Sequence, residues 1–129
     1  MLYAFGRSLA RWLFILGFDV RVRRPLRTPP PGGFVLASNH QSYLDPVLVA
    51  ACLPREMHFM ARKSLFRNRA FRAVITTCNA FPIERDAADL KGVKEAISRL
   101  KGGNLLLVFP EGTRTRDGSV GRMKGGVGI

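Results

Sequence analysis

The chain has 129 residues, 47% of them hydrophobic, and a formal net charge of +12 from 21 Lys and Arg against 9 Asp and Glu. This composition excludes a disordered chain, and the length suits one domain with its own core. The cationic excess favours an anionic partner, which could be a nucleic acid, an acidic membrane surface or a phosphorylated substrate. Cys52 and Cys78 stand far apart in apolar surroundings, so we expect two reduced thiols in the core.

Residues 1–18 have the pattern of an amphipathic helix. One side of the helix carries Leu2, Phe5, Leu9, Trp12, Leu13 and Leu16, and the opposite side carries Arg7 and Arg11. The apolar run is shorter than the ~20 residues that span a bilayer. Two interpretations stay open: a helix packed on its own domain, or an interfacial helix with Trp12 at the boundary and the arginines among anionic lipid heads. We favour the second and assign residues 1–26 to an N-terminal amphipathic helix and basic segment.

Prolines and glycines over residues 27–33 predict a linker, and strand and helix signals alternate over residues 34–129. Strands are expected over residues 34–38, 57–61 and 76–83, and over the apolar run NLLLVFPEG at residues 104–112. Helices are expected over residues 45–52, with Asp45 as N-cap, over 64–74, with Ser64 as cap, and over 86–101, with an apolar stripe of Leu90, Val93, Ile97 and Leu100. This alternation predicts an α/β domain, a mostly parallel sheet with flanking helices.

Polar residues follow three of the expected strands, at the edge where ligand sites collect in parallel sheets. The first strand ends at Asn39-His40, the third at Glu84-Arg85 and the last at residues 111–114. A carboxylate such as Asp45 on one imidazole nitrogen of His40 leaves the other nitrogen free to accept a proton. No nucleophile is well placed beside this pair, so we expect the proton to come from a substrate hydroxyl. His58 is interpreted as structural, and no clustered ligand spacing predicts a metal site.

Four blocks of the sequence resemble the glycerolipid acyltransferases, the family of 1-acyl-glycerol-3-phosphate (lysophosphatidate) acyltransferases. The segment Asn39-His40-Gln-Ser-Tyr-Leu-Asp45 resembles the NHxxxxD motif of that family. The segment FPEGTR at residues 109–114 resembles its second hallmark. Between them, ARKSLF at residues 61–66 and AFPIER at residues 80–85 are similar to the intermediate blocks, in the same order.

This resemblance implies that His40 is the general base and that Asp45 orients it. It also implies a set of residues around the acceptor and its phosphate, namely Lys63, Arg85, Glu111, Gly112, Thr113 and Arg114. Within this set we expect Glu111 to hold Arg114 or an acceptor hydroxyl, because its charge would repel the phosphate.

The reaction implied by the resemblance moves a fatty acyl group from an acyl thioester, on coenzyme A or acyl carrier protein, to the free hydroxyl of a lysophospholipid. The acceptor would be 1-acyl-glycerol-3-phosphate and the product phosphatidic acid. No acyl-enzyme and no cofactor beyond the thioester co-substrate are implied. The expected location is the cytoplasmic face of the membrane, where a peripheral or monotopic protein would contact membrane lipids.

The family pattern continues past FPEGTR into a further helix and a proline-bearing strand, whereas the sequence stops at Ile129. We therefore expect a domain that is incomplete at its C-terminus. The alternative is that the chain is a catalytically inactive fragment whose function is to bind lysolipid or membrane. A nucleic-acid-binding module is suggested by charge alone, without interleaved aromatic residues or a recognisable motif, so no nucleic-acid partner is expected.

Overall fold

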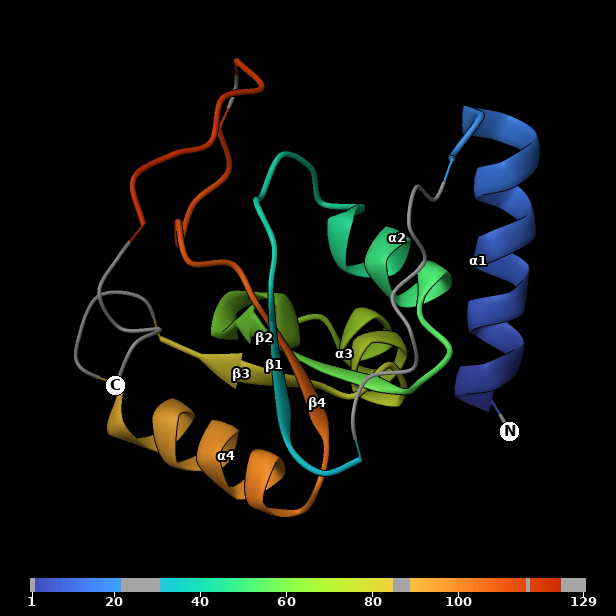
Figure 1. The fold of residues 1–129 in the computed structure, drawn as a ribbon. Helices are drawn as coiled ribbons and strands as arrows, with labels where there is room; N and C mark the ends of the chain where they lie inside the picture. Colours follow the sequence, from blue (N-terminus) through green and yellow to red (C-terminus); the bar gives the residue numbers. More distant parts are fainter. Residues whose placement is uncertain (1, 22–30, 85–88, 116, 124–129) are drawn as a thin grey trace.

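The computed structural model describes residues 2–21, 31–84, 89–115 and 117–123, which form a four-stranded sheet with flanking helices (Figure 1). The strand order is β1-β4-β2-β3, and every neighbouring pair is parallel. The strands are β1 (Phe34–Ala37), β2 (Met57–Arg62), β3 (Ala80–Ile83) and β4 (Leu105–Val108). The helices are α1 (Leu2–Phe18), α2 (Asp45–Cys52), the 3₁₀ helix η1 (Lys63–Phe66), α3 (Arg69–Thr77) and α4 (Leu90–Lys101). The predicted α/β architecture with a parallel sheet is confirmed.

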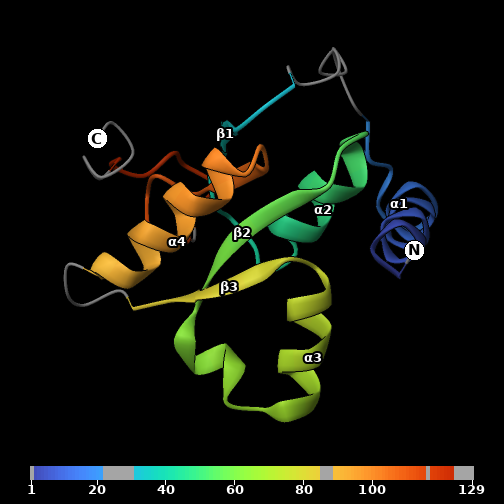
Figure 2. The ribbon, with the colours of Figure 1, turned by 90° about the horizontal axis from the view of Figure 1, so that it is seen from below.

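Strand β4 lies inside the sheet and is covered on both faces, which explains its uninterrupted apolar sequence. Leu105 and Leu107 pack with Met57 beneath α2. Leu106, which points the other way, packs with Ala96 of α4. Figure 2 shows α4 across the sheet from α2 and α3. The helices therefore cover both faces and leave the carboxyl ends of β1 and β4 for the loops that follow them.

Four local predictions were wrong. Asp45 is the first residue of α2, and Leu44 occupies the cap position. The expected helix over residues 64–74 is instead η1 followed by α3, whose N-cap is Asn68, with a side chain that accepts the Phe71 N–H at 2.9 Å. Because α3 continues to Thr77, the strand expected from residue 76 begins only at Ala80. The two cysteines are free thiols, but both are exposed rather than buried in the core.

Helix α4 has the predicted period, but the side that faces the sheet is rotated from the predicted stripe, of which only Leu100 packs against the core. Asp89 caps it by accepting the Gly92 N–H at 2.9 Å, and the residues expected before it, 86–88, lie outside the described part of the chain. Gly92 and Ala96 are buried against the sheet. Three members of the apolar stripe are exposed instead: Leu90, Val93 and Ile97. The small residues face the sheet because they allow the helix a close approach, and a Cβ at Gly92 would lie 3.1 Å from Ile83.

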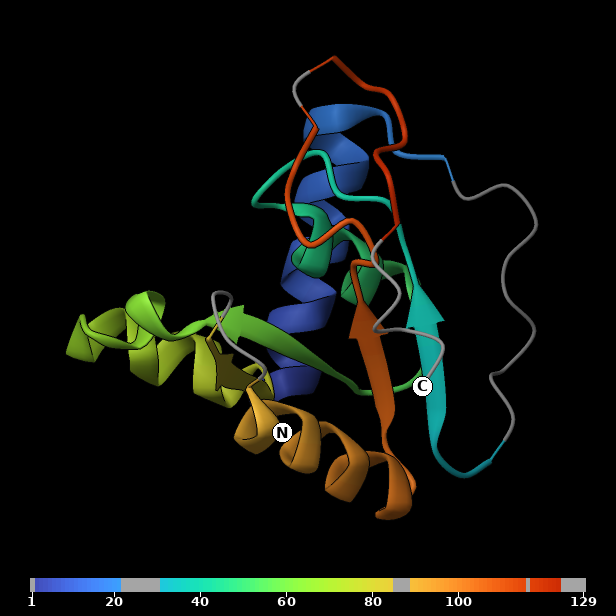
Figure 3. The same ribbon diagram turned by 90° about the vertical axis from the view of Figure 1, so that its left-hand side faces the viewer.

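Helix α1 packs on α2 with one face and leaves the other face uncovered (Figures 1 and 3). The Tyr3 hydroxyl accepts the Met57 N–H at 3.0 Å, Arg7 donates to the Leu53 carbonyl at 3.3 Å, and Phe14 is buried. The exposed apolar residues are Phe5, Leu9, Trp12, Leu13, Ile15, Leu16 and Phe18. Arg7 therefore belongs to the packed side, and the expectation that it lies among lipid headgroups was wrong.

Two further points concern the N-terminal region. Within the described residues, no helix has both the length and the apolar character needed to cross a bilayer. The expected linker over residues 27–33 and the basic segment before it fall largely on residues 22–30, which lie outside the described part.

Candidate active site

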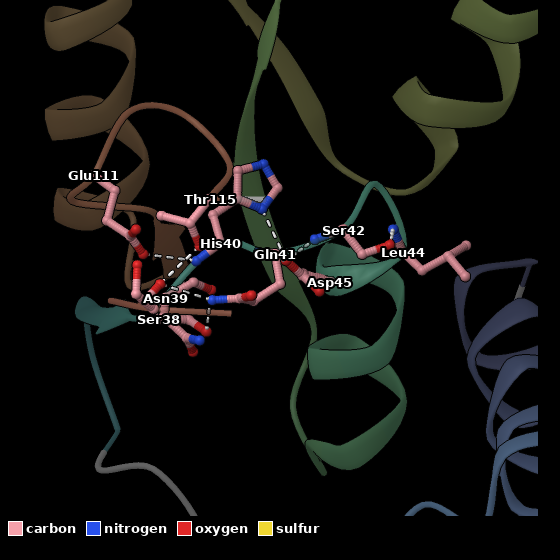
Figure 4. Close-up of polar contacts among 10 residues, drawn as sticks. Ser38, Asn39, His40, Gln41, Ser42, Leu44, Asp45, Glu111 and Thr115 are labelled. Carbon is pink, nitrogen blue, oxygen red and sulfur yellow. Dashed lines mark hydrogen bonds and ion pairs between the residues drawn. The ribbon is translucent and has the colours of Figure 1, made fainter. Parts of the chain in front are cut away.

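The two principal motifs meet because their strands are neighbours. Strands β1 and β4 pair in parallel with Ala37 opposite Val108, so the chain leaves both strands at the same edge (Figure 3). The loop after β1 carries His40, and the loop after β4 carries Glu111. Figure 4 shows the two loops facing each other across several hydrogen bonds. The site thus lies at the carboxyl end of the sheet, as expected.

The His40 ring is buried and held by two contacts. Its Nδ1 lies 2.9 Å from Asp45 Oδ2, its ring stacks on Phe109 with centroids 4.0 Å apart, and its residue surface is only 9% exposed. When Nδ1 carries the proton that is donated to Asp45, Nε2 is left as an acceptor. Figure 4 shows this second nitrogen pointing away from Asp45, and no described residue hydrogen-bonds to it. The predicted pairing of His40 with Asp45 is present.

Asp45 also organises the loop between itself and His40. Its Oδ2 accepts the backbone N–H groups of Gln41 at 2.6 Å and Ser42 at 2.8 Å, in addition to the His40 ring. Burial alone would raise the pKa of Asp45, but the hydrogen bonds from Ser42, His40 and Gln41 outweigh it and hold the pKa below its ordinary value. The carboxylate therefore stays charged beside the imidazole, which suits the orientation and stabilisation of a protonated ring.

The buried side chain of Glu111 links two loops by hydrogen bonds. It is 4% exposed, its Oε1 accepts the His40 N–H at 2.8 Å, and its Oε2 accepts the Gly121 N–H at 2.7 Å. Both carboxylate oxygens thus bind backbone groups of this chain. The expectation that Glu111 holds Arg114 or an acceptor hydroxyl was wrong, because its burial and its two backbone partners give it a different place.

The FPEGTR segment makes a tight turn at Gly112, and only the residues after that glycine are exposed. The Gly112 N–H donates to the Phe109 carbonyl at 3.0 Å, and Gly112 has a φ of 67°, a conformation that favours glycine. Thr113 and Arg114 are exposed. The Arg114 guanidinium lies over the Tyr43 ring, with Cζ 3.4 Å from the ring centroid. These residues lie beside the His40 loop, as the motifs predicted.

Lys63 follows β2 and forms an ion pair with Glu84, which follows β3. This hydrogen bond with Glu84 raises the pKa of the Lys63 ammonium, and both side chains are exposed. Its partner in the structure is therefore Glu84 rather than a residue of the His40 loop. The predicted site residue Arg85 lies outside the described residues.

Several contacts at the site carry no signal in the sequence. The Thr115 N–H donates to the His40 carbonyl at 3.0 Å, and Gln41 Nε2 and Thr115 Oγ1 both donate to the Ser119 carbonyl, at 3.0 and 2.7 Å. Tyr43 sits in the variable part of the motif spacing, so only its aromatic character could have suggested the contact with Arg114. His58 lies outside this site, as expected, with Nδ1 2.7 Å from Arg99 Nη1. In the described parts of the chain, no three His, Cys, Asp or Glu side chains gather as metal ligands.

Comparison with known proteins agrees with this geometry. The acyltransferase family model matches residues 19–129. The 1-acyl-sn-glycerol-3-phosphate acyltransferase of Bacillus subtilis is 32% identical over 117 residues, which are 90% of this chain and 59% of that protein. The protein of the same name from Streptococcus pneumoniae is 40% identical over 83 residues, or 63% of this chain and 31% of that one.

A solved structure is also similar. The crystal structure of the 1-acyl-sn-glycerophosphate acyltransferase PlsC from Thermotoga maritima is 31% identical, with a TM-score of 0.74 over 95% of this chain and 48% of that chain. The matched part of this chain covers between 31% and 59% of the length of these three relatives. The match of the family model over residues 19–129, together with the His40 and FPEGTR loops brought into contact, means that the chain belongs to the acyltransferase family.

Proposed function

We propose that this chain provides the catalytic centre for acyl transfer from a thioester to the free hydroxyl of a lysophospholipid. The acceptor we infer is 1-acyl-glycerol-3-phosphate, and the product is phosphatidic acid. The observation that carries this proposal is the His40–Asp45 pair, with Nδ1 bound to a carboxylate and Nε2 left free. The names of the Bacillus subtilis and Streptococcus pneumoniae relatives support the choice of acceptor.

The chemistry follows from this pair. His40 Nε2 accepts the proton of the acceptor hydroxyl while that oxygen attacks the thioester carbonyl, and Asp45 stabilises the imidazolium that forms. When the tetrahedral intermediate collapses, the carbon–sulfur bond breaks and the imidazolium returns its proton to the leaving thiolate. Ser42 is not activated as an alternative nucleophile, because no described residue accepts its hydroxyl proton, and its Oγ instead accepts the Leu44 N–H at 3.1 Å. The acceptor is therefore acylated directly.

The phosphate of the acceptor needs cationic groups near the base. Arg114 is exposed, and the only contact that the described structure gives its guanidinium is through the flat face, on Tyr43, so its N–H groups remain available for a phosphate. Gly112 and Thr113 lie in the same turn. We assign Lys63 and Arg85 supporting roles in attracting the anionic substrates, Lys63 from its pair with Glu84 at the ends of β2 and β3.

The membrane is the proposed source of the acceptor. Helix α1 presents exposed Leu9, Trp12, Leu13 and Leu16 while its opposite side is bound to α2. Such a face suits insertion into the headgroup layer of a bilayer, where the aromatic ring takes the boundary position. The proposed location is the cytoplasmic face of a membrane, and the donor is acyl coenzyme A or acyl carrier protein.

Acyl transfer to lysophosphatidate by the purified chain and by its His40→Ala variant tests the proposal. Wild-type turnover should fall by about 10²–10⁴-fold in the variant, because a positioned general base contributes that much, while lysophosphatidate binding stays within a few-fold. A variant that retains more than about a tenth of the rate would exclude the general-base role. A wild-type chain that binds lysophosphatidate without turnover would instead identify the inactive binding fragment.

A further inference from the structure

Tyr43 and Arg114 come from two different motifs and meet at the surface of the site. Arg114 Cζ lies 3.4 Å from the centroid of the Tyr43 ring, so the guanidinium lies over the ring face. Tyr43 is 72% exposed and is therefore not part of the core. Within the described residues, its hydroxyl makes no hydrogen bond. Its one distinctive contact is the platform that it offers to a cation.

This platform is fixed relative to the base from both sides. Tyr43 lies between His40 and Asp45, in the loop that Asp45 Oδ2 holds through the Gln41 and Ser42 N–H groups. Arg114 immediately precedes Thr115, whose N–H donates to the His40 carbonyl at 3.0 Å. The two stacked side chains are thus each anchored within a few residues of a direct hydrogen bond to the His40 loop.

Stacking changes what an arginine can do. A free guanidinium samples many directions, whereas one that lies flat on an aromatic ring presents its N–H groups at the edge of a fixed plane. A phosphate oxygen pair can accept two of those N–H groups as a fork. Because the ring neutralises no charge, the arginine keeps its full attraction for an anion, which a carboxylate partner would reduce.

We propose that Tyr43 is a specificity-determining residue that positions Arg114 for the phosphate monoester of the acceptor. This inference rests on the proposed acyl transfer and identifies the group that selects a phosphorylated lysolipid over a neutral one. Tyr43 acts through Arg114 and touches no reacting atom, so its effect falls on the affinity for acceptors that carry phosphate.

The test compares Tyr43→Leu, which removes the ring, with Tyr43→Phe, which keeps the ring and removes only the hydroxyl. With lysophosphatidate as acceptor, Tyr43→Leu should raise KM by about 2- to 5-fold, the range expected for an exposed cation–π contact. Tyr43→Phe should stay within about 2-fold of wild type, and with a monoacylglycerol acceptor both variants should match wild type in KM. In the Arg114→Ala background, Tyr43→Leu should add nothing, since the two residues act as a unit.

Four results would overturn the proposal. They are an equal rise of KM for monoacylglycerol, an undiminished effect of Tyr43→Leu in the Arg114→Ala background, a loss in Tyr43→Phe as large as in Tyr43→Leu, and a rise confined to the KM of acyl coenzyme A. The last result would assign Arg114 to the phosphates of the donor.

The proposed function can fail separately from this inference. If the wild-type chain shows no turnover with any acceptor, equilibrium titration with lysophosphatidate compares the Kd of wild type with that of Tyr43→Leu. A weaker Kd for Tyr43→Leu alone supports the positioning role even then. An unchanged Kd, or no binding by wild type, overturns it. Thermal unfolding should give the same Tm for all Tyr43 variants, because the side chain is exposed.

Discussion

The Gly121 N–H donates to Glu111 Oε2 at 2.7 Å, and a side chain at Gly121 would collide with the same oxygen, since its Cβ would lie only 2.6 Å away. The other carboxylate oxygen holds the His40 N–H. Glu111 therefore links the segment around Gly121 to His40, in addition to the direct hydrogen bond from the Thr115 N–H to the His40 carbonyl.

Gly121→Ala should displace Glu111 and lower kcat for every acceptor alike, with or without phosphate, because it disturbs the loop that carries His40. The expected loss is at least about tenfold, since small displacements at a catalytic group are costly. Gly6→Ala in α1 is the matched control, since its Cβ would meet nothing within 4 Å. The role assigned to Glu111 would not stand if both variants kept wild-type kcat.

Arg114→Ala should raise KM for lysophosphatidate by about 10- to 150-fold, because a charge-assisted hydrogen bond contributes roughly 1.5–3 kcal/mol. The change with a monoacylglycerol acceptor should be much smaller. Arg114→Lys keeps the charge and loses the planar fork, so its KM for lysophosphatidate should lie between those of wild type and Arg114→Ala. Steady-state kinetics with both acceptors measures this, and equal losses would place Arg114 away from the phosphate.

Because one face of α1 is exposed, we expect substitutions on that face to weaken membrane binding without changing the stability of the fold. The double variant Leu13→Ser, Leu16→Ser should lose co-sedimentation with phosphatidylglycerol vesicles and keep its Tm, because both side chains are exposed. Phe14→Ala is the control on the packed side and should lower stability by about 3 kcal/mol. Undiminished vesicle binding by the double variant would show that another surface makes the contact.

His58 predicts a pH dependence of stability. Burial, and then the neighbouring Arg99 cation, lower the pKa of His58, although Glu56 and Glu95 act in the opposite direction. The unfolded chain therefore binds a proton near pH 6.5 that the folded chain does not, and stability is lost as the pH falls from that value toward the lower folded pKa.

Urea unfolding at pH 7.5 and pH 5 measures this loss. The His58→Gln variant, which keeps an acceptor for Arg99 and has no titrating ring, should lose less stability between the two pH values than wild type does. Identical losses in the two proteins would assign the pH dependence to other groups.

The sequence predicted those features of the site that depend on short stretches of chain. His40 lies in the short loop that ends at Asp45, the first residue of α2, so their spacing sets the reach between them, and the structure places His40 Nδ1 2.9 Å from Asp45 Oδ2. The apolar run of β4 also identified a strand covered on both faces.

What could not be predicted depends on close approach between distant segments. The period of α4 was clear from the sequence, but the side that faces the sheet is decided by how closely the helix can approach it. Gly92 and Ala96 allow a closer approach than Val93 or Ile97 would. The role of Glu111 was missed for a similar reason. A carboxylate in a polar motif suggests a contact with substrate. Only the fold shows that the Glu111 carboxylate accepts hydrogen bonds from two backbone N–H groups, those of His40 and Gly121.

The pairing of β1 with β4 has a consequence for how such a chain tolerates insertions. The elements from β2 to α4 separate the two motifs along the chain. The register of Ala37 with Val108 is nevertheless set by the direct pairing of β1 with β4. Extra residues between η1 and α3 would enlarge this excursion without moving either motif. A single added residue between Ala37 and His40 would instead shift His40 relative to Glu111, so the length of that short connection is under far tighter constraint than that of the long one.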